Sequence, residues 1–83
     1  MVDEEHLKDI INVLTELKKD GSVPRNVKEK IDSTIEILKA ETELSIKINK
    51  ALHELEEVAD DVNLQPFTRT QLWNVVSMLE KIA

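Results

Sequence analysis

Residues 61–74 read DVNLQPFTRTQLWN, and this stretch holds both aromatic residues of the chain together with its strongest helix-start signal. Thr68 and Gln71 stand three positions apart, like the two members of a capping box, and Phe67 and Leu72 occupy the staple positions around them. The stretch therefore predicts a helix over residues 68–82 that begins at a Thr68 cap. Apolar residues carry its stripe to the end of the chain with the helical period: Leu72, Val75, Val76, Leu79 and Ile82.

A weaker copy of this signal lies around residues 20–29. Gly21 predicts a left-handed stop for a first helix over residues 3–20, which Asp3 caps at its start. A second helix, over residues 25–40, follows Pro24. Either Pro24 is its first residue, or Asn26 caps it with Glu29 as the capping-box partner.

The chain between residues 25 and 60 contains no Gly or Pro, so one long helix has to be weighed against two shorter ones. Continuing the stripe of the second helix requires apolar residues near 42, 45 and 49, where Thr42, Ser45 and Asn49 stand. The apolar residues that follow are displaced by about 100° of helix rotation. This shift predicts a short turn around residues 41–45, with Thr42 or Ser45 as cap, and a third helix over residues 45–60.

Four amphipathic helices in 83 residues predict one all-α domain over residues 1–83, a four-helix up-and-down bundle. Two pseudo-repeated helical hairpins build it. Residues 14–17 match residues 52–55, and Pro24 with its following cap matches Pro66, at spacings that differ by about one helical turn. One Gly, two Pro, no Cys and 34% charged residues suit such a fold.

The net charge of −6 is unevenly spread along the chain. Residues 18–30 carry five basic and two acidic side chains, whereas the end of the third helix is acidic. An up-and-down bundle brings these segments to the same end, which predicts salt bridges between them. In the alternative interpretation, Arg25 and Asn26 at a helix N-terminus contact RNA or phosphate. The overall negative charge opposes that alternative, so no nucleic-acid partner is expected.

Residues for catalysis are scarce. A chain without cysteine has no thiolate nucleophile, and Gly21 alone cannot form a glycine-rich phosphate loop. Di-iron bundles use the motif Glu-x-x-His, and His53 does not complete it because Lys50 stands three residues before it. Asp3 and His6 have the required spacing, but they lie at the terminus of the chain. We therefore expect no catalytic residue, cofactor or metal, and a solvent-exposed His53. A metal-dependent enzyme is the remote alternative.

Binding to a partner protein is the function that remains. Several apolar residues fall off the main stripes of their helices: Ile37, Ile46, Trp73 and Met78. Trp73, one turn beyond Arg69, has the composition of a binding anchor, although Trp73 could equally pack between neighbouring helices. The sequence predicts a non-enzymatic interaction module for an unknown protein partner or for itself, as a homodimer. Its candidate contact residues are Arg69, Trp73, Arg25 and Asn26.

Location follows from the absence of targeting signals in this sequence. Residues 1–5 are acidic where a signal peptide is basic, and no apolar run approaches the roughly 20 residues that cross a bilayer. We expect a cytoplasmic protein without membrane association.

Three short motifs occur together: Val-Pro-Arg-Asn at 23–26, Thr-Arg-Thr at 68–70 and Trp-Asn-Val-Val-Ser at 73–77. In these motifs, and in the order of its elements over nearly the whole length, the chain resembles the small archaeal uncharacterised protein family 0147. The resemblance implies an all-helical, bundle-like fold in an archaeal cytosol. It implies no activity.

Overall fold

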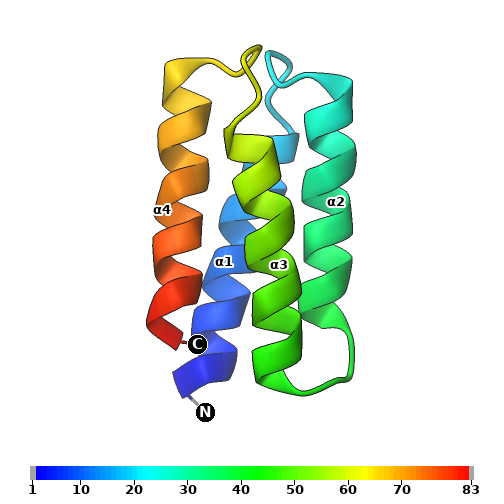
Figure 1. The fold of residues 1–83 in the computed structure, drawn as a ribbon, viewed down its shortest axis with the longest axis vertical. Helices are drawn as coiled ribbons and strands as arrows, with labels where there is room; N and C mark the ends of the chain where they lie inside the picture. Colours follow the sequence, from blue (N-terminus) through cyan, green and yellow to red (C-terminus); the bar gives the residue numbers. More distant parts are fainter. Residues whose placement is uncertain (1, 83) are drawn as a thin grey trace.

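Four α-helices make up the computed structural model, which describes residues 2–82 and side chains from residue 5 onward. They are α1 (Val2–Lys18), α2 (Arg25–Lys39), α3 (Leu44–Ala59) and α4 (Pro66–Ile82). The helices run alternately up and down, and each packs against two neighbours in a closed ring, with the α1–α2 and α3–α4 loops at the same end (Figure 1). The predicted all-α four-helix bundle is confirmed.

One apolar stripe from each helix forms the core along the bundle axis. Residues with no exposed surface include Leu14 of α1, Ile31 of α2, Leu55 of α3 and Leu72 of α4. Each such side chain contributes about 1.5–3 kcal/mol by leaving water. The predicted stripes are therefore the ones that the protein buries, and they hold the four helices together.

The two hairpins repeat with one constant offset of 41 residues. Loop hydrogen bonds show this offset: the Ser22 N–H donates to Asp20 Oδ1 over 2.9 Å, and the Asn63 N–H donates to Asp61 Oδ1 over 2.8 Å. A single register thus spans both hairpins, and the one-turn difference predicted from sequence is wrong. Every buried residue in the first hairpin has a buried counterpart 41 positions later: Leu7/Ile48, Ile10/Ala51, Leu14/Leu55, Leu17/Val58, Val23/Leu64, Val27/Thr68, Ile31/Leu72, Thr34/Val75, Ile35/Val76 and Leu38/Leu79.

Helix α4 begins two residues earlier than predicted, at Pro66. The Arg69 N–H donates to the Gln65 carbonyl over 3.0 Å, which makes Pro66 the first helical residue. Proline suits this position because its φ is already helical and no N–H is needed there. Thr68 is consequently a buried residue of the first turn, and Phe67 is 66% exposed. The predicted capping box and hydrophobic staple are wrong.

Helix α2 begins at Arg25, with Pro24 as its N-cap residue. The Lys28 N–H donates to the Pro24 carbonyl over 3.0 Å, and Asn26 is already inside the helix. The predicted start at residue 25 agrees with the structure, but Pro24 is not the first helical residue and Asn26 is not the cap. Pro24 therefore corresponds to Gln65 and not to Pro66, which is why aligning the two prolines gave the wrong offset.

The end of α1 does not need a glycine. Gly21 has no positive φ, and the helix closes instead through short turns, with the Asp20 N–H donating to the Leu17 carbonyl over 3.2 Å. The counterpart of Gly21 is Val62, which is 89% exposed. The predicted left-handed stop is wrong. Helix α1 itself begins by Val2, and the side chain of the predicted cap Asp3 lies outside the described residues.

The turn between α2 and α3 lies over residues 40–43, close to the predicted break. Glu43 precedes α3 and no side chain caps the helix, so the predicted caps Thr42 and Ser45 are wrong. Lys47 stabilises the turn instead. Its Nζ donates to the carbonyls of Leu38 (3.3 Å) and Ala40 (3.1 Å), where a cation suits the negative end of α2.

The corrected start of α4 predicts the effect of Thr68→Val. Thr68 is 2% exposed and corresponds to the apolar Val27, so the substitution should leave the free energy of unfolding unchanged or raise it by up to about 1 kcal/mol. Urea denaturation of both proteins measures this. A loss of about 1 kcal/mol, the cost of deleting a helix N-cap, would contradict the assignment of Thr68 to the core.

Candidate functional site

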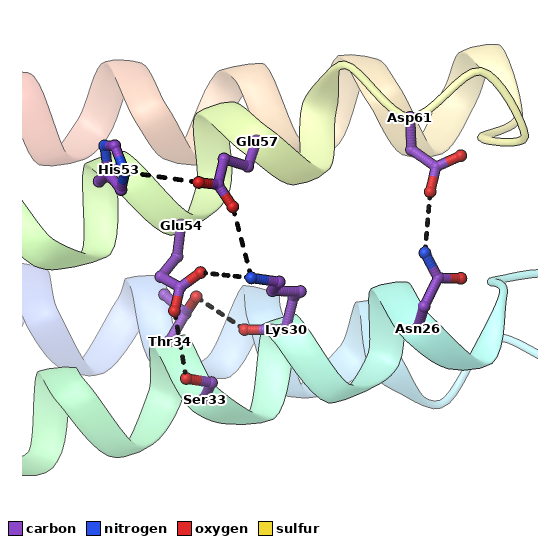
Figure 2. A network of polar contacts seen from close by, with 8 residues as sticks. All are labelled: Asn26, Lys30, Ser33, Thr34, His53, Glu54, Glu57 and Asp61. Atoms are coloured by element: carbon purple, nitrogen blue, oxygen red, sulfur yellow. Dashed lines mark hydrogen bonds and ion pairs between the residues drawn. The ribbon is translucent and has the colours of Figure 1, made fainter.

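The seam between α2 and α3 is closed by charged side chains near the two loops. Lys30 Nζ lies 3.1 Å from Glu54 Oε2 and 3.4 Å from Glu57 Oε2, as Figure 2 shows. Hydrogen bonds to Glu54, then to Glu57, raise the pKa of the Lys30 ammonium. Ser33 Oγ adds a 3.5 Å hydrogen bond to the other oxygen of Glu54. The predicted pairing of the basic segment with α3 is confirmed for Lys30.

Asn26 extends this seam to the loop that follows α3. Its Nδ2 donates to Asp61 Oδ2 over 3.0 Å (Figure 2). The backbone N–H of Asn63, then the Asn26 amide, hold the pKa of the Asp61 carboxyl below its ordinary value. Asn26 therefore has an intramolecular role, since it ties the start of α2 to the α3–α4 loop.

Arg69 also acts within its own chain. Its Nε donates to the Ala59 carbonyl over 3.2 Å, and its Nη2 donates to the Asp61 carbonyl over 2.8 Å. These acceptors lie at and just beyond the end of α3, where carbonyl groups lack helical partners. The guanidinium therefore caps α3 from the first turn of α4, which accounts for an arginine at this position without a partner protein.

Trp73 and Arg25 are the two predicted contact residues that stay accessible. Trp73 is 41% exposed on α4, and Arg25 is exposed at the start of α2. Among the residues that the structure describes, Arg25 makes no hydrogen bond or ion pair. The structure does not bring these two together with a second functional group, so their role in binding stays a prediction.

Two further lysines of the basic segment form ion pairs with α1 and α2 side chains. Lys18 pairs with Asp32 of α2, and Lys19 lies 3.8 Å from Glu16. His53 is exposed, as predicted, with Nε2 3.4 Å from a Glu57 oxygen. Within residues 5–82, no group of three or more His, Asp or Glu side chains is arranged to hold a metal ion.

A shallow depression of about 480 Å³ runs along the α2–α3 seam below these contacts. Its lining includes Lys30, Glu54 and Glu57, which already pair with one another. Ligands would have to compete with these pairs. The depression is lined by Lys30, Ile37, Asn49, Lys50, His53, Glu54 and Glu57.

A second groove, of about 370 Å³, lies between α1 and α4 and has a different character. The Phe67 ring, 66% exposed, forms an apolar wall with Val13 and Leu17, and Glu16 and Asp20 supply carboxylates. We call it the α1–α4 groove; Asn12, Val13, Glu16, Leu17, Asp20, Phe67 and Gln71 line it. The sequence prediction missed this site because it treated Phe67 as a buried staple.

One carboxylate of this groove is fixed by its own loop. Asp20 Oδ1 accepts hydrogen bonds from the Ser22 N–H over 2.9 Å and from the Ser22 hydroxyl over 2.8 Å. These bonds, the backbone one first, lower the pKa of Asp20, so the group is held in its charged form.

Across residues 2–82, no helix is long and apolar enough to cross a membrane.

The fold and these surfaces define a class of small antiparallel four-helix bundles built from two equivalent hairpins. The sequence profile of the uncharacterised protein family UPF0147 matches residues 1–82, and the chain belongs to this family. The resemblance seen in the three sequence motifs is thereby confirmed.

Relatives from archaea match over nearly the whole chain. The UPF0147 protein MJ1419 of Methanocaldococcus jannaschii is 38% identical over 80 residues, covering 95% of this chain and 86% of that protein. The UPF0147 protein PH1921.2 of Pyrococcus horikoshii is 37% identical over 81 residues, with 95% and 87% covered. A crystal structure of the unknown function protein MMP1188 superposes with a TM-score of 0.90 at 36% identity, covering 96% of this chain and 92% of that one.

The capping role of Arg69 predicts that Arg69→Met lowers the free energy of unfolding by about 1–2 kcal/mol, because two carbonyls lose a charged donor. Arg25→Met is the matched control. It removes an exposed arginine without intramolecular contacts among the described residues, and its effect should stay within about 0.5 kcal/mol. Thermal and urea unfolding measure both. Equal effects of the two substitutions would show that Arg69 does not stabilise the end of α3.

Proposed function

We propose that this protein is a non-enzymatic interaction module whose binding site for another protein is the α1–α4 groove. The observation that carries the proposal is the exposed Phe67 ring on the wall of a largely apolar groove. Aromatic side chains dominate binding energy at protein interfaces when a partner covers them.

The composition of the two depressions favours this site over the α2–α3 seam. In the seam, the ammonium of Lys30 and two carboxylates satisfy each other, so a partner gains little there. In the α1–α4 groove, Val13 and Phe67 present apolar surface whose burial is favourable without breaking any existing pair.

The shape of the groove favours a helical partner segment. It lies between two antiparallel helices, and such grooves bind amphipathic helices through residues one turn apart. Phe67 and Gln71 stand one turn apart on α4, and Glu16 in the last turn of α1 and Asp20 in the following loop line the opposite side. Trp73 and Ile46, each 41% exposed, are secondary candidates for contact with the same or another partner. A second copy of this chain is the alternative occupant of the groove. The cytoplasmic location of the protein stays a prediction.

The test compares natural protein with a Phe67→Asn variant in chemical cross-linking of a native cell extract. Asn26 stands at the equivalent position of α2, so asparagine fits this backbone site and the variant should fold. We expect cross-linked protein partners that the variant loses. Val62→Ser is the control, since it removes another exposed apolar side chain, outside the groove, and should keep these partners. Identical cross-links from natural protein and Phe67→Asn would exclude the groove as the binding site.

A further inference from the structure

The 41-residue repeat makes the α1–α4 groove the counterpart of the α2–α3 seam. Because α1 corresponds to α3 and α4 to α2, each position of one surface has an equivalent on the other. Glu16 corresponds to Glu57, Leu17 to Val58 and Asp20 to Asp61. Two of the three carboxylates of the seam, Glu57 and Asp61, therefore have acidic counterparts in the groove, whereas Glu54 corresponds to the apolar Val13.

The opposite side of the two surfaces differs at two decisive positions. The seam has Asn26 and Lys30, which donate to Asp61, Glu54 and Glu57. The groove has Phe67 and Gln71 at the same places. The seam has two hollows, one of about 130 Å³ between Asn26, Lys30, Glu57 and Asp61 and one of about 480 Å³ beside Lys30, Glu54 and Glu57, against about 370 Å³ for the α1–α4 groove. The two surfaces therefore differ in the chemistry of their lining and not in free space.

The groove thus keeps the equivalents of Glu57 and Asp61 but not of Glu54, and it lacks the cation that its counterpart supplies. Glu16 has only an exposed, 3.8 Å contact with Lys19 within the described chain, a contact of the kind that contributes little. In Asp20, Oδ1 accepts both hydrogen bonds from Ser22. In the equivalent Asp61, Oδ2 also accepts a hydrogen bond, from the Asn26 amide. A net charge of −6 further attracts a basic partner.

We propose that the α1–α4 groove binds a basic amphipathic helix of another protein, whose lysine pairs with Glu16, the counterpart of one of the two carboxylates that bind Lys30 in the α2–α3 seam. The ammonium pairs with Glu16 and Asp20, and an apolar residue one turn away packs on Phe67 and Val13. This inference rests on the proposed function and adds the chemistry of the partner.

The probe is a labelled synthetic peptide of about 14 residues, roughly four helical turns, with leucine and lysine at the helical period. Fluorescence anisotropy measures its binding to the full chain. We expect the peptide to bind, and a peptide with glutamate in place of lysine to bind at least about tenfold more weakly, because like charges then meet at the rim. Equal affinity of the two peptides would overturn the lysine assignment.

Two variants test the site itself. Glu16→Gln with Asp20→Asn should weaken binding of the lysine peptide at least about tenfold, while Glu56→Gln with Asp60→Asn, a matched pair of exposed carboxylates on the other hairpin, should change it by less than about twofold. Gln71→Lys should abolish binding, because it supplies a cation at the position equivalent to Lys30. Thr70→Lys, which adds the same charge on the neighbouring helix position, should not.

The outcomes separate this inference from the proposed function. If Phe67→Asn abolishes binding but the carboxylate variant and Gln71→Lys do not, the groove binds an apolar segment and the lysine assignment is wrong. If Phe67→Asn has no effect on the peptide or on the cross-linked partners, both proposals fail. A homodimer in light scattering that Phe67→Asn converts to monomer would assign the groove to a second copy and overturn the basic-helix proposal.

Discussion

Burial of one aliphatic stripe per helix is the constraint on which the rest of the structure depends. The stripe must face the bundle axis along four helices of 15–17 residues, and it does so with the same spacing in both hairpins. Leu14 and Leu55, 41 residues apart, both lose all contact with solvent. Because the core fixes the rotation of every helix, it also fixes which side chains meet at the seams between neighbours.

The two hairpins differ at their seams and not in their core. Between α2 and α3, Lys30 and Asn26 bind the carboxylates opposite them, and the surface is complete within one chain. Between α1 and α4, Phe67 and Gln71 stand at the same places and leave an apolar groove beside Glu16 and Asp20. The repeat preserves its core and differs at one seam, and this seam is where we propose that a partner binds.

Helix number and stripes could be predicted from the sequence because each depends on periodicity within a single helix. The up-and-down topology could be predicted because short loops connect consecutive helices. The helix boundaries depended on backbone geometry. The sequence predicted Thr68 as the cap of α4, but the helix begins at Pro66. It also predicted a left-handed stop at Gly21, but the φ of this glycine is not positive. Arg69 was predicted to contact a partner and Phe67 to form a hydrophobic staple. Only the tertiary structure shows that the arginine caps α3 and that the ring is exposed. Aligning the two hairpins at an offset of 41 residues would have shown from the sequence that Phe67 and Gln71 stand in place of Asn26 and Lys30.

The central claim is that Phe67 and Gln71 line an exposed apolar groove, whereas the equivalent Asn26 and Lys30 bind carboxylates of their own chain. Solution NMR with a soluble paramagnetic agent tests it on the unmodified protein, because solvent-accessible side chains lose signal and buried ones keep it. The account predicts strong attenuation of the Phe67 ring and of the Val13 methyl groups, and none for the Val27 and Leu72 methyl groups. A Phe67 ring as protected as Leu72 would show that the α1–α4 groove is filled by its own chain and would contradict the account.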